Sequence, residues 1–268
     1  MAEPIRILHH WACSGGTILS RAIASQPGAV FLSEIHPHAY LRIASPRHHY
    51  LPTDLLQQLS LTRNGADPTL LNATFRGAII SLQQELETSG RHLVIRSHSH
   101  SEFFVGEPLT TKPLISELLA PHWPLRQLLT VRHPLDSWLS LLQSAWLEQQ
   151  PYRELGPYCE RILIMLEACK AMPWIRYEEF CGQPEALLQQ ICDLLMLPFD
   201  PMVLEKERLL QVKISGNSGR SANIIKITPR RQVPEAVASE ATVAEPYRQV
   251  CERLGYNPNP ECTWPFLA

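Results

Sequence analysis

The chain has 268 residues, of which 45% are hydrophobic, and its formal net charge is −2 at pH 7. This length fits a single α/β domain with additional segments, and the nearly balanced charge excludes a broad basic face for a nucleic-acid backbone. No stretch has the length and apolar character of a signal peptide or a transmembrane helix. We therefore expect a cytoplasmic protein without a membrane span.

The cysteines and histidines do not follow a known ligand or disulfide pattern. The seven cysteines are odd in number and include no Cys-x-x-Cys pair. This predicts reduced, mostly buried thiols rather than disulfides or a zinc site. The eleven histidines include adjacent pairs such as His9-His10, but the spacing of metal-binding motifs is missing, so no metal is predicted.

The first predicted elements are a strand, a loop and a helix. Residues 5–8 are a short apolar run typical of a buried strand, and apolar residues recur at helical spacing from Ile18 onward. The loop between them contains Gly15 and Gly16, which allow a close approach to the backbone. Backbone N–H groups and the positive end of a helix meet above such a loop, which suits a phosphate. The alternative is that the two glycines are present only for steric reasons, because many turns between a strand and a helix are glycine-rich.

This loop differs from that of ordinary ATP and GTP enzymes. Their Gly-Lys-Ser/Thr signature is absent, and no lysine occurs in residues 1–30. A phosphate bound here would be held by backbone N–H groups and hydroxyls. The sequence therefore favours another class of phosphorylated nucleotide.

Strands and helices alternate through the next part of the chain. Further strands are predicted at residues 28–32, 92–95, 125–131 and 173–177. Helices are predicted at residues 53–60, 68–89, 113–120, 134–145, 153–170, 184–197 and 244–254. The alternation predicts an α/β fold of three layers, α/β/α, with a central and mainly parallel sheet.

Three segments have a weaker periodicity. Residues 36–66 and 98–112 contain long irregular stretches, and such stretches often cover a binding site, although a surface excursion has the same pattern. We predict that these two segments shape a substrate pocket. Residues 200–268 are predicted to be less regular, apart from the last helix.

Polar side chains follow the predicted strands. Glu34 follows the second strand, Arg96 and His98 follow the third, and Arg132 follows the fourth. Ligands of open α/β sheets bind beyond the carboxyl ends of the strands. These four side chains are therefore candidates for a functional site.

Arg132 is the strongest phosphate-binding candidate. Its forked guanidinium suits a phosphate, and Ser140, eight residues later, adds a hydroxyl donor. The alternative is an ion pair between Arg132 and a carboxylate such as Asp136. Residues 215–221, with two glycines, three serines and an arginine, form either a donor-rich anion loop or an ordinary surface loop.

These stretches resemble, in order, the sulfotransferases that use 3′-phosphoadenosine 5′-phosphosulfate (PAPS). The Cys-Ser-Gly-Gly-Thr sequence at residues 13–17 resembles the loop that holds the 5′-phosphosulfate. Arg132 and Ser140 match the arginine and serine, eight residues apart, that hold the 3′-phosphate. Residues 175–180 resemble the segment whose tyrosine, here Tyr177, lies near the adenine.

The resemblance extends to the last loop and implies a complete nucleotide site. Ser218-Gly219-Arg220 resembles the glycine and basic loop that closes over the 3′-phosphate. The implied fold is the P-loop-like sulfotransferase fold in one domain, residues 1–268, with residues 200–268 closing over the nucleotide. The nucleotide-binding residues that the resemblance implies are Cys13, Ser14, Gly15, Gly16, Thr17, Ile18, Arg132, Ser140, Tyr177, Ser218, Gly219 and Arg220.

The implied reaction moves the sulfuryl group from PAPS to a hydroxyl or amine of a small-molecule or carbohydrate acceptor, with PAP as the other product. Cys13 stands where the family has a basic residue, and Gly16 where threonine or serine is common. Arg96 is the candidate for the missing charge, because Arg96-Ser97-His98 resembles the family's Lys-Thr-His, whose histidine is the base. Glu34 resembles the glutamate base of other members. The alternatives are a hydrogen-bonded loop histidine for His98 and, for Glu34, a partner of Arg96 or of the N-terminus of a neighbouring helix. Two further functions stay open, a non-catalytic nucleotide-binding relative and a P-loop-like kinase.

Overall fold

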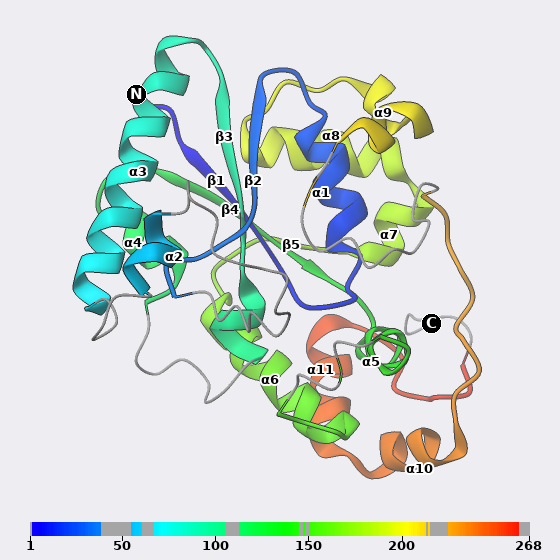
Figure 1. The fold of residues 1–268 in the computed structure, drawn as a ribbon. Helices are drawn as coiled ribbons and strands as arrows, with labels where there is room; N and C mark the ends of the chain where they lie inside the picture. The colour runs from blue at the N-terminus through cyan, green and yellow to red at the C-terminus, as the bar shows by residue number, and fades with distance from the viewer. Residues whose placement is uncertain are drawn as a thin grey trace.

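The computed structural model describes residues 2–38, 55–60, 67–104, 113–144, 147, 151–212, 214 and 225–262. A sheet of five parallel strands forms its centre, in the order β2-β3-β1-β4-β5 (Figure 1). The strands are β1 (Ile5–His10), β2 (Ala29–Ile35), β3 (His92–Ser97), β4 (Leu125–Val131) and β5 (Trp174–Arg176). The predicted parallel sheet is confirmed, and β2 and β3 extend beyond their predicted ends.

Helices connect and cover the strands. Those before β5 are α1 (Gly16–Ala24), α2 (Leu55–Ser60), α3 (Pro68–Thr88), the π-helix η1 (His100–Phe104), α4 (Ile115–Leu119), α5 (Pro134–Leu142) and α6 (Leu155–Ala168). Those after β5 are α7 (Tyr177–Gly182), α8 (Pro184–Leu195), the 3₁₀-helix η3 (Pro201–Leu204), α9 (Lys206–Gln211), α10 (Glu235–Val243) and α11 (Glu245–Leu254).

Strand β1 shows how the sheet is covered on both faces. Ile5 and Ile7 pack in one cluster with α3 and α4, whereas Leu8 packs in another with α1 and α8. This two-residue period is expected for a strand buried between two helical layers. Figure 1 shows α3 and α4 on one side of the sheet and α1, α8 and α9 on the other. The three-layer prediction is confirmed.

Several helix starts follow from local capping. The Asp67 carboxylate accepts a hydrogen bond from the Thr69 N–H at 3.0 Å, ahead of Pro68. His133 Nδ1 accepts from the Leu135 N–H at 3.2 Å and caps α5. Such caps satisfy N–H groups that the helix itself leaves unpaired, and proline is tolerated in the first turn. The predicted helix starts at Pro68, Pro134 and Pro184 are confirmed for α3, α5 and α8.

The short helices α2 and α4 were predicted, whereas several others were not. Residues 101–104, predicted as loop, lie in η1, and Tyr177, predicted in the fifth strand, begins α7. The C-terminal part is more regular than predicted, because η3, α9 and α10 lie within it. Helices of four to six residues, such as η3, α7 and α9, are too short to show a helical period in the sequence. Residues 105–112 lie outside the described residues.

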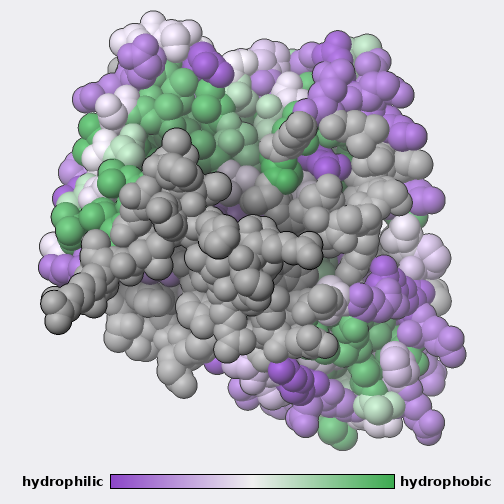
Figure 2. All heavy atoms as spheres, viewed as in Figure 1, coloured by the Kyte–Doolittle hydropathy of each residue, from purple (hydrophilic) through white to green (hydrophobic). Residues whose placement is uncertain are grey.

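Strand β2 forms one edge of the sheet, and all seven of its residues are half-buried. Figure 2 shows hydrophobic residues gathered over this strand on the viewed face. Val30 and Leu32 pack against the core under α3. The edge strand thus covers one side of the core. Glu34 is its second-last residue and lies at the carboxyl edge of the sheet. Among the described residues, no helix is both long and apolar enough to cross a bilayer.

Glu102 in η1 is a carboxylic acid buried in this fold, with 1% of its surface exposed. Its Oε1 accepts a hydrogen bond from the Ile115 N–H at 3.2 Å, and His36 Nε2 lies 3.8 Å from the same oxygen. Burial raises the pKa of Glu102 to about 7. The protonated form is therefore favoured in the folded protein below about pH 7.

We expect the contribution of Glu102 to stability to fall as the pH rises from about 4.5 to above 7, because the folded state holds this proton longer than the unfolded state. Glu102→Gln removes a titration worth about 3 kcal/mol at 1.36 kcal/mol per pKa unit. The variant should be more stable than the wild type at pH 8 and similar to it at pH 5, measured by urea unfolding. The exposed Glu252→Gln is the control, and an equal effect of Glu102→Gln at both pH values would contradict the assignment.

Candidate functional site

The loop after β1 makes a tight turn into α1. The Trp11 carbonyl oxygen accepts hydrogen bonds from the Ser14 hydroxyl at 2.8 Å and from the Ser14 N–H at 3.2 Å. Cys13 and Gly15 have φ values of 63° and 86°, in the left-handed region. Helix α1 then starts at Gly16. The turn therefore directs the first N–H groups of α1 toward the carboxyl edge of the sheet, as expected for an anion site.

Gly15 and Gly16 are each required by an aromatic ring. A Cβ at Gly15 would lie 2.0 Å from Cδ2 of Tyr177, and a Cβ at Gly16 would lie 2.2 Å from Cδ2 of His10. The steric purpose that the sequence left open is thus present at both positions. The same packing places Tyr177, a predicted nucleotide-binding residue, and His10 directly against the loop.

Arg132 follows β4 and reaches the same loop. Its Nη1 donates a hydrogen bond to the Cys13 carbonyl oxygen at 2.8 Å, and its guanidinium carbon lies 5.1 Å from the centre of the Tyr177 ring. The alternative ion pair with Asp136 is wrong, because Asp136 accepts from Arg230 Nε at 2.9 Å. The structure therefore brings together the loop, Arg132 and Tyr177, three parts of the predicted nucleotide site.

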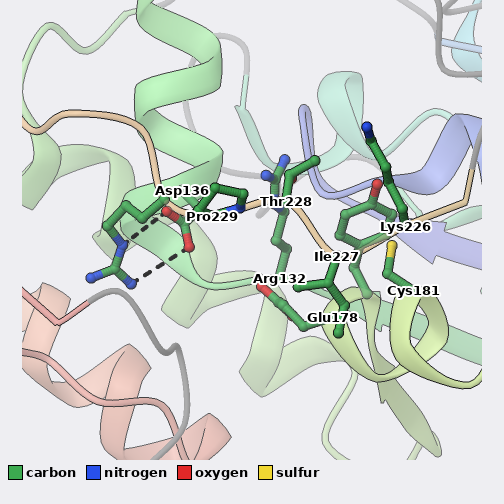
Figure 3. Close-up of a pocket in the computed structure, with 10 residues that line it drawn as sticks. Arg132, Asp136, Glu178, Cys181, Lys226, Ile227, Thr228 and Pro229 are labelled. Atoms are coloured by element: carbon green, nitrogen blue, oxygen red, sulfur yellow. Dashed lines mark hydrogen bonds and ion pairs between the residues drawn. The ribbon is translucent and has the colours of Figure 1, made fainter.

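A pocket of about 290 Å³ opens beside these residues (Figure 3). It is lined by Arg132, Asp136, Tyr177, Glu178, Cys181, Lys226, Ile227, Thr228, Pro229 and Arg230. The second half of this set comes from the C-terminal part of the chain, which passes over α5 and α7. In Figure 3 the side chains of Arg132 and Lys226 extend in the same direction.

The pocket carries a surplus of positive charge. Asp136 is paired with Arg230, and Glu178 accepts hydrogen bonds from the His133 N–H at 2.9 Å and the Tyr256 hydroxyl at 2.8 Å. Burial raises the pKa of Glu178. Within the described part of the chain, no carboxylate forms an ion pair with Arg132 or Lys226. Such a pocket suits a multiply charged anion.

Arg230 fastens the C-terminal segment over the pocket. In addition to Asp136, its Nη1 donates to the carbonyl oxygens of Asn259 at 3.2 Å and Cys262 at 2.7 Å. Its side chain is 3% exposed. The sequence did not single out Lys226 or Arg230, because their place beside Arg132 depends on the path of a segment far along the chain.

The predicted catalytic residues lie together at the ends of β2 and β3. Arg96 Nη2 lies 2.8 Å from Glu34 Oε1, and Arg96 Nε donates to His10 Nε2 at 2.8 Å. His98 Nδ1 and Ser101 Oγ are 2.6 Å apart. The pKa of His98 is lowered by burial and by Arg96, against the opposing effect of Glu34. His98 is therefore neutral near pH 7 and able to accept a proton.

His10 is the residue of this group that the sequence did not identify. It was considered only as part of a histidine pair, and its position between Arg96 and Gly16 follows from the pairing of β1 with β3. Burial and Arg96 lower the pKa of His10 well below its usual range. In the described part of the chain, no group of His, Cys, Asp and Glu side chains is placed to bind a metal ion.

The other predicted residues occupy varied places. Ile18 is buried in the core, Thr17 lies in the first turn of α1, and the Cys13 side chain packs against the aromatic cluster of α5 and α6. Ser140 is one turn beyond Ser137, which accepts from Trp11 Nε1 at 3.1 Å, so this face of α5 is turned to the loop. Ser218, Gly219 and Arg220 lie outside the described residues.

Comparison with known proteins places this site in a known fold. No protein-family model and no curated protein matches the chain. Among solved structures, the chain is similar to the sulfotransferase domain from the curacin biosynthetic pathway, with a TM-score of 0.57 and 19% identity over 95% of this chain and 98% of that one. It is also similar to the sulfotransferase domain of the Synechococcus PCC 7002 olefin synthase, with a TM-score of 0.51 and 18% identity over 96% and 97%. The chain therefore has the sulfotransferase fold over nearly its full length.

Gly15→Ala should destabilise the protein by about 1–3 kcal/mol, because the position is left-handed and the added Cβ would clash with Tyr177. Gly77→Ala is the matched control, since Gly77 lies exposed in α3 with nothing near its Cβ position. We expect that control to stabilise the protein by about 0.5–1 kcal/mol. Urea unfolding measures both changes, and wild-type stability in Gly15→Ala would contradict the described loop geometry.

Proposed function

We propose that this protein is a sulfotransferase that binds PAPS and transfers its sulfuryl group to a hydroxyl or amine of a small-molecule or carbohydrate acceptor. One observation carries the proposal. The loop after β1, Arg132 and Tyr177 meet at the carboxyl edge of a sheet that has the sulfotransferase fold. These are the groups from which the sequence predicted a nucleotide site.

The nucleotide would lie across this edge. The proposed 5′ site consists of the loop from Cys13 to Thr17 with the first N–H groups of α1, including that of Ile18. The proposed 3′ site uses Arg132 and Ser140, with Ser218, Gly219 and Arg220 from the late loop. Tyr177 would lie near the adenine. The fit is supported by two cations, Arg132 and Lys226, that line one pocket without a carboxylate partner among the described residues.

The acceptor would enter from the other end of the site. Residues 36–66 and 98–112 are the proposed pocket segments, and both lead away from strand ends that carry Glu34 and His98. Residues 200–268 would close over the nucleotide, in one domain that covers residues 1–268. Arg230 supports this proposal, because it fastens the segment that covers the pocket.

The proposed reaction is an in-line displacement at sulfur. A bond forms between the acceptor oxygen or nitrogen and sulfur, while the bond from sulfur to the 5′-phosphate oxygen breaks. His98 would take the acceptor proton, and its lowered pKa leaves it neutral for this role. Arg96 and the N–H groups at the start of α1 would stabilise the charge that develops on the leaving phosphate. No step requires a metal ion.

The direct test of the function combines binding with turnover. PAP binding is measured by calorimetry, and transfer of sulfate from PAPS is measured with a panel of phenols, alcohols, sugars and amines. Binding together with transfer supports the enzyme. Binding without transfer to any acceptor favours the non-catalytic relative, and magnesium-dependent turnover of ATP favours a kinase.

Arg132→Ala should weaken PAP binding by about 1.5–3 kcal/mol, the range for a hydrogen bond to a charged group. Binding of AMP, which lacks the 3′-phosphate, should change little. Arg231→Ala serves as the control, because Arg231 contacts Gln143 and does not line the pocket. Equal losses for PAP and AMP in calorimetry would refute the assignment of Arg132 to the 3′ end.

His98→Ala should lower kcat by roughly 10²–10⁴-fold, the usual contribution of a general base. PAP should still bind, because the proposed role of His98 concerns the acceptor proton. Steady-state kinetics and calorimetry measure the two effects. Near-normal kcat in His98→Ala would exclude His98 as the base.

A further inference from the structure

A chain of contacts runs from the edge strand β2 to the start of α1. Glu34 Oε1 lies 2.8 Å from Arg96 Nη2, and Arg96 Nε donates to His10 Nε2 at 2.8 Å. The His10 ring in turn packs against Gly16, so closely that a Cβ there would lie 2.2 Å from it. Arg96 is therefore held on one side by β2 and on the other by His10, the residue next to the loop between β1 and α1, here called the anion loop.

The backbone of β2 is shaped for this contact. Glu34 has a φ of 56°, in the left-handed region that non-glycine residues rarely adopt. The register between β2 and β3 also shifts between Leu32 and Ile35, as in a β-bulge. Bulges redirect side chains, and strained residues persist where the surrounding structure holds them in place. The distortion coincides with the residue whose carboxylate reaches Arg96.

Burial makes this contact important for Arg96. Its side chain is 4% exposed, compared with 25% for Glu34. A buried guanidinium needs a charged partner and hydrogen-bond acceptors. Among the described residues, the titratable groups facing the pair are His10, His98 and His100, and burial lowers the pKa of all three. At neutral pH these histidines are uncharged, so Glu34 supplies the negative charge opposite Arg96.

His10 completes the arrangement as an acceptor. Because Arg96 Nε–H donates to His10 Nε2, that nitrogen carries the lone pair and the neutral ring carries its proton on Nδ1. A protonated His10 would lose this contact. The neutral His10 ring thus contacts Arg96 on one side and Gly16, the first residue of α1, on the other.

We infer that Glu34 is a positioning residue for Arg96, holding its guanidinium beside the anion loop, and that it is not the base of the reaction. The inference rests on the proposed function and deepens it. The sequence resemblance implies a basic residue at position 13, where this chain has Cys13. The Glu34–Arg96–His10 contacts hold a cation, Arg96 of the neighbouring strand β3, beside the loop instead. Glu34 acts through Arg96, whereas His98 is left to accept the proton.

The kinetic test compares two substitutions at Glu34. Glu34→Gln keeps an oxygen that accepts from Arg96, so kcat should fall by less than about tenfold. Glu34→Ala removes the ion-pair partner of the guanidinium and leaves its contacts with His10 and Ser33, and the resulting misplacement of Arg96 should lower kcat by about 10²-fold. The acidic limb of the kcat–pH profile should be retained in both variants, since His98 is intact. Glu252→Gln, on the exposed side of α11, is the control.

Two kinetic outcomes overturn the inference. If Glu34→Gln and Glu34→Ala are equally inactive and lose the acidic limb, Glu34 is the base. If Glu34→Ala retains wild-type kcat, the ion pair has no role in the reaction. Failure of the proposed function itself looks different, because the wild type would then neither bind PAP nor transfer sulfate.

A second measurement reports the position of Arg96 without turnover. The Arg96 Nε–H proton, assigned in NMR spectra by its loss in Arg96→Lys, should exchange slowly with solvent in the wild type and in Glu34→Gln. It should exchange faster by about tenfold or more in Glu34→Ala, where the guanidinium has lost its ion-pair partner. Unchanged protection in Glu34→Ala would show that Glu34 does not hold Arg96, whatever the activity.

Discussion

The pairing of β1 with β3 on one side and β4 on the other is the constraint on which the site depends. All five strands are parallel, so their carboxyl ends meet at one edge. Helix α1, which follows β1, packs on one face of the sheet, and α5, which follows β4, packs on the other. In open α/β sheets, ligands bind in the crevice between two such connections. This topology places the loop between β1 and α1 between Arg96, in β3, and Arg132, after β4.

The two sides of that loop differ in charge balance. On the β4 side, Arg132 and Lys226 line a pocket in which the described carboxylates are already engaged by other groups. On the β3 side, Arg96 is matched by Glu34 and surrounded by neutral histidines. The β4 side is therefore suited to bind a phosphate. The β3 side holds the buried Arg96 guanidinium in a fixed position.

Cys13, at the position where the sequence resemblance implies a basic residue, lies in a partly apolar environment. The Cys13 side chain packs against a cluster that includes Trp138, Tyr152 and Tyr158, an environment in which a lysine or arginine would be costly to bury. The loop at this point is stabilised instead by its own turn and by the hydrogen bond from Arg132 to the Cys13 carbonyl oxygen. Charge near the loop comes from the neighbouring strands.

The sequence by itself determined the elements whose signals are local. Apolar runs predicted the strands, Asp67 and the prolines predicted helix starts, and the glycine loop and Arg132 predicted an anion site, because each pattern depends on residues close in the chain. Tertiary structure alone decided that Glu34 pairs with Arg96, that His10 lies between Arg96 and Gly16, and that Lys226 lines the Arg132 pocket. These contacts join residues distant in sequence, and they depend on which strand ends become neighbours when the sheet forms.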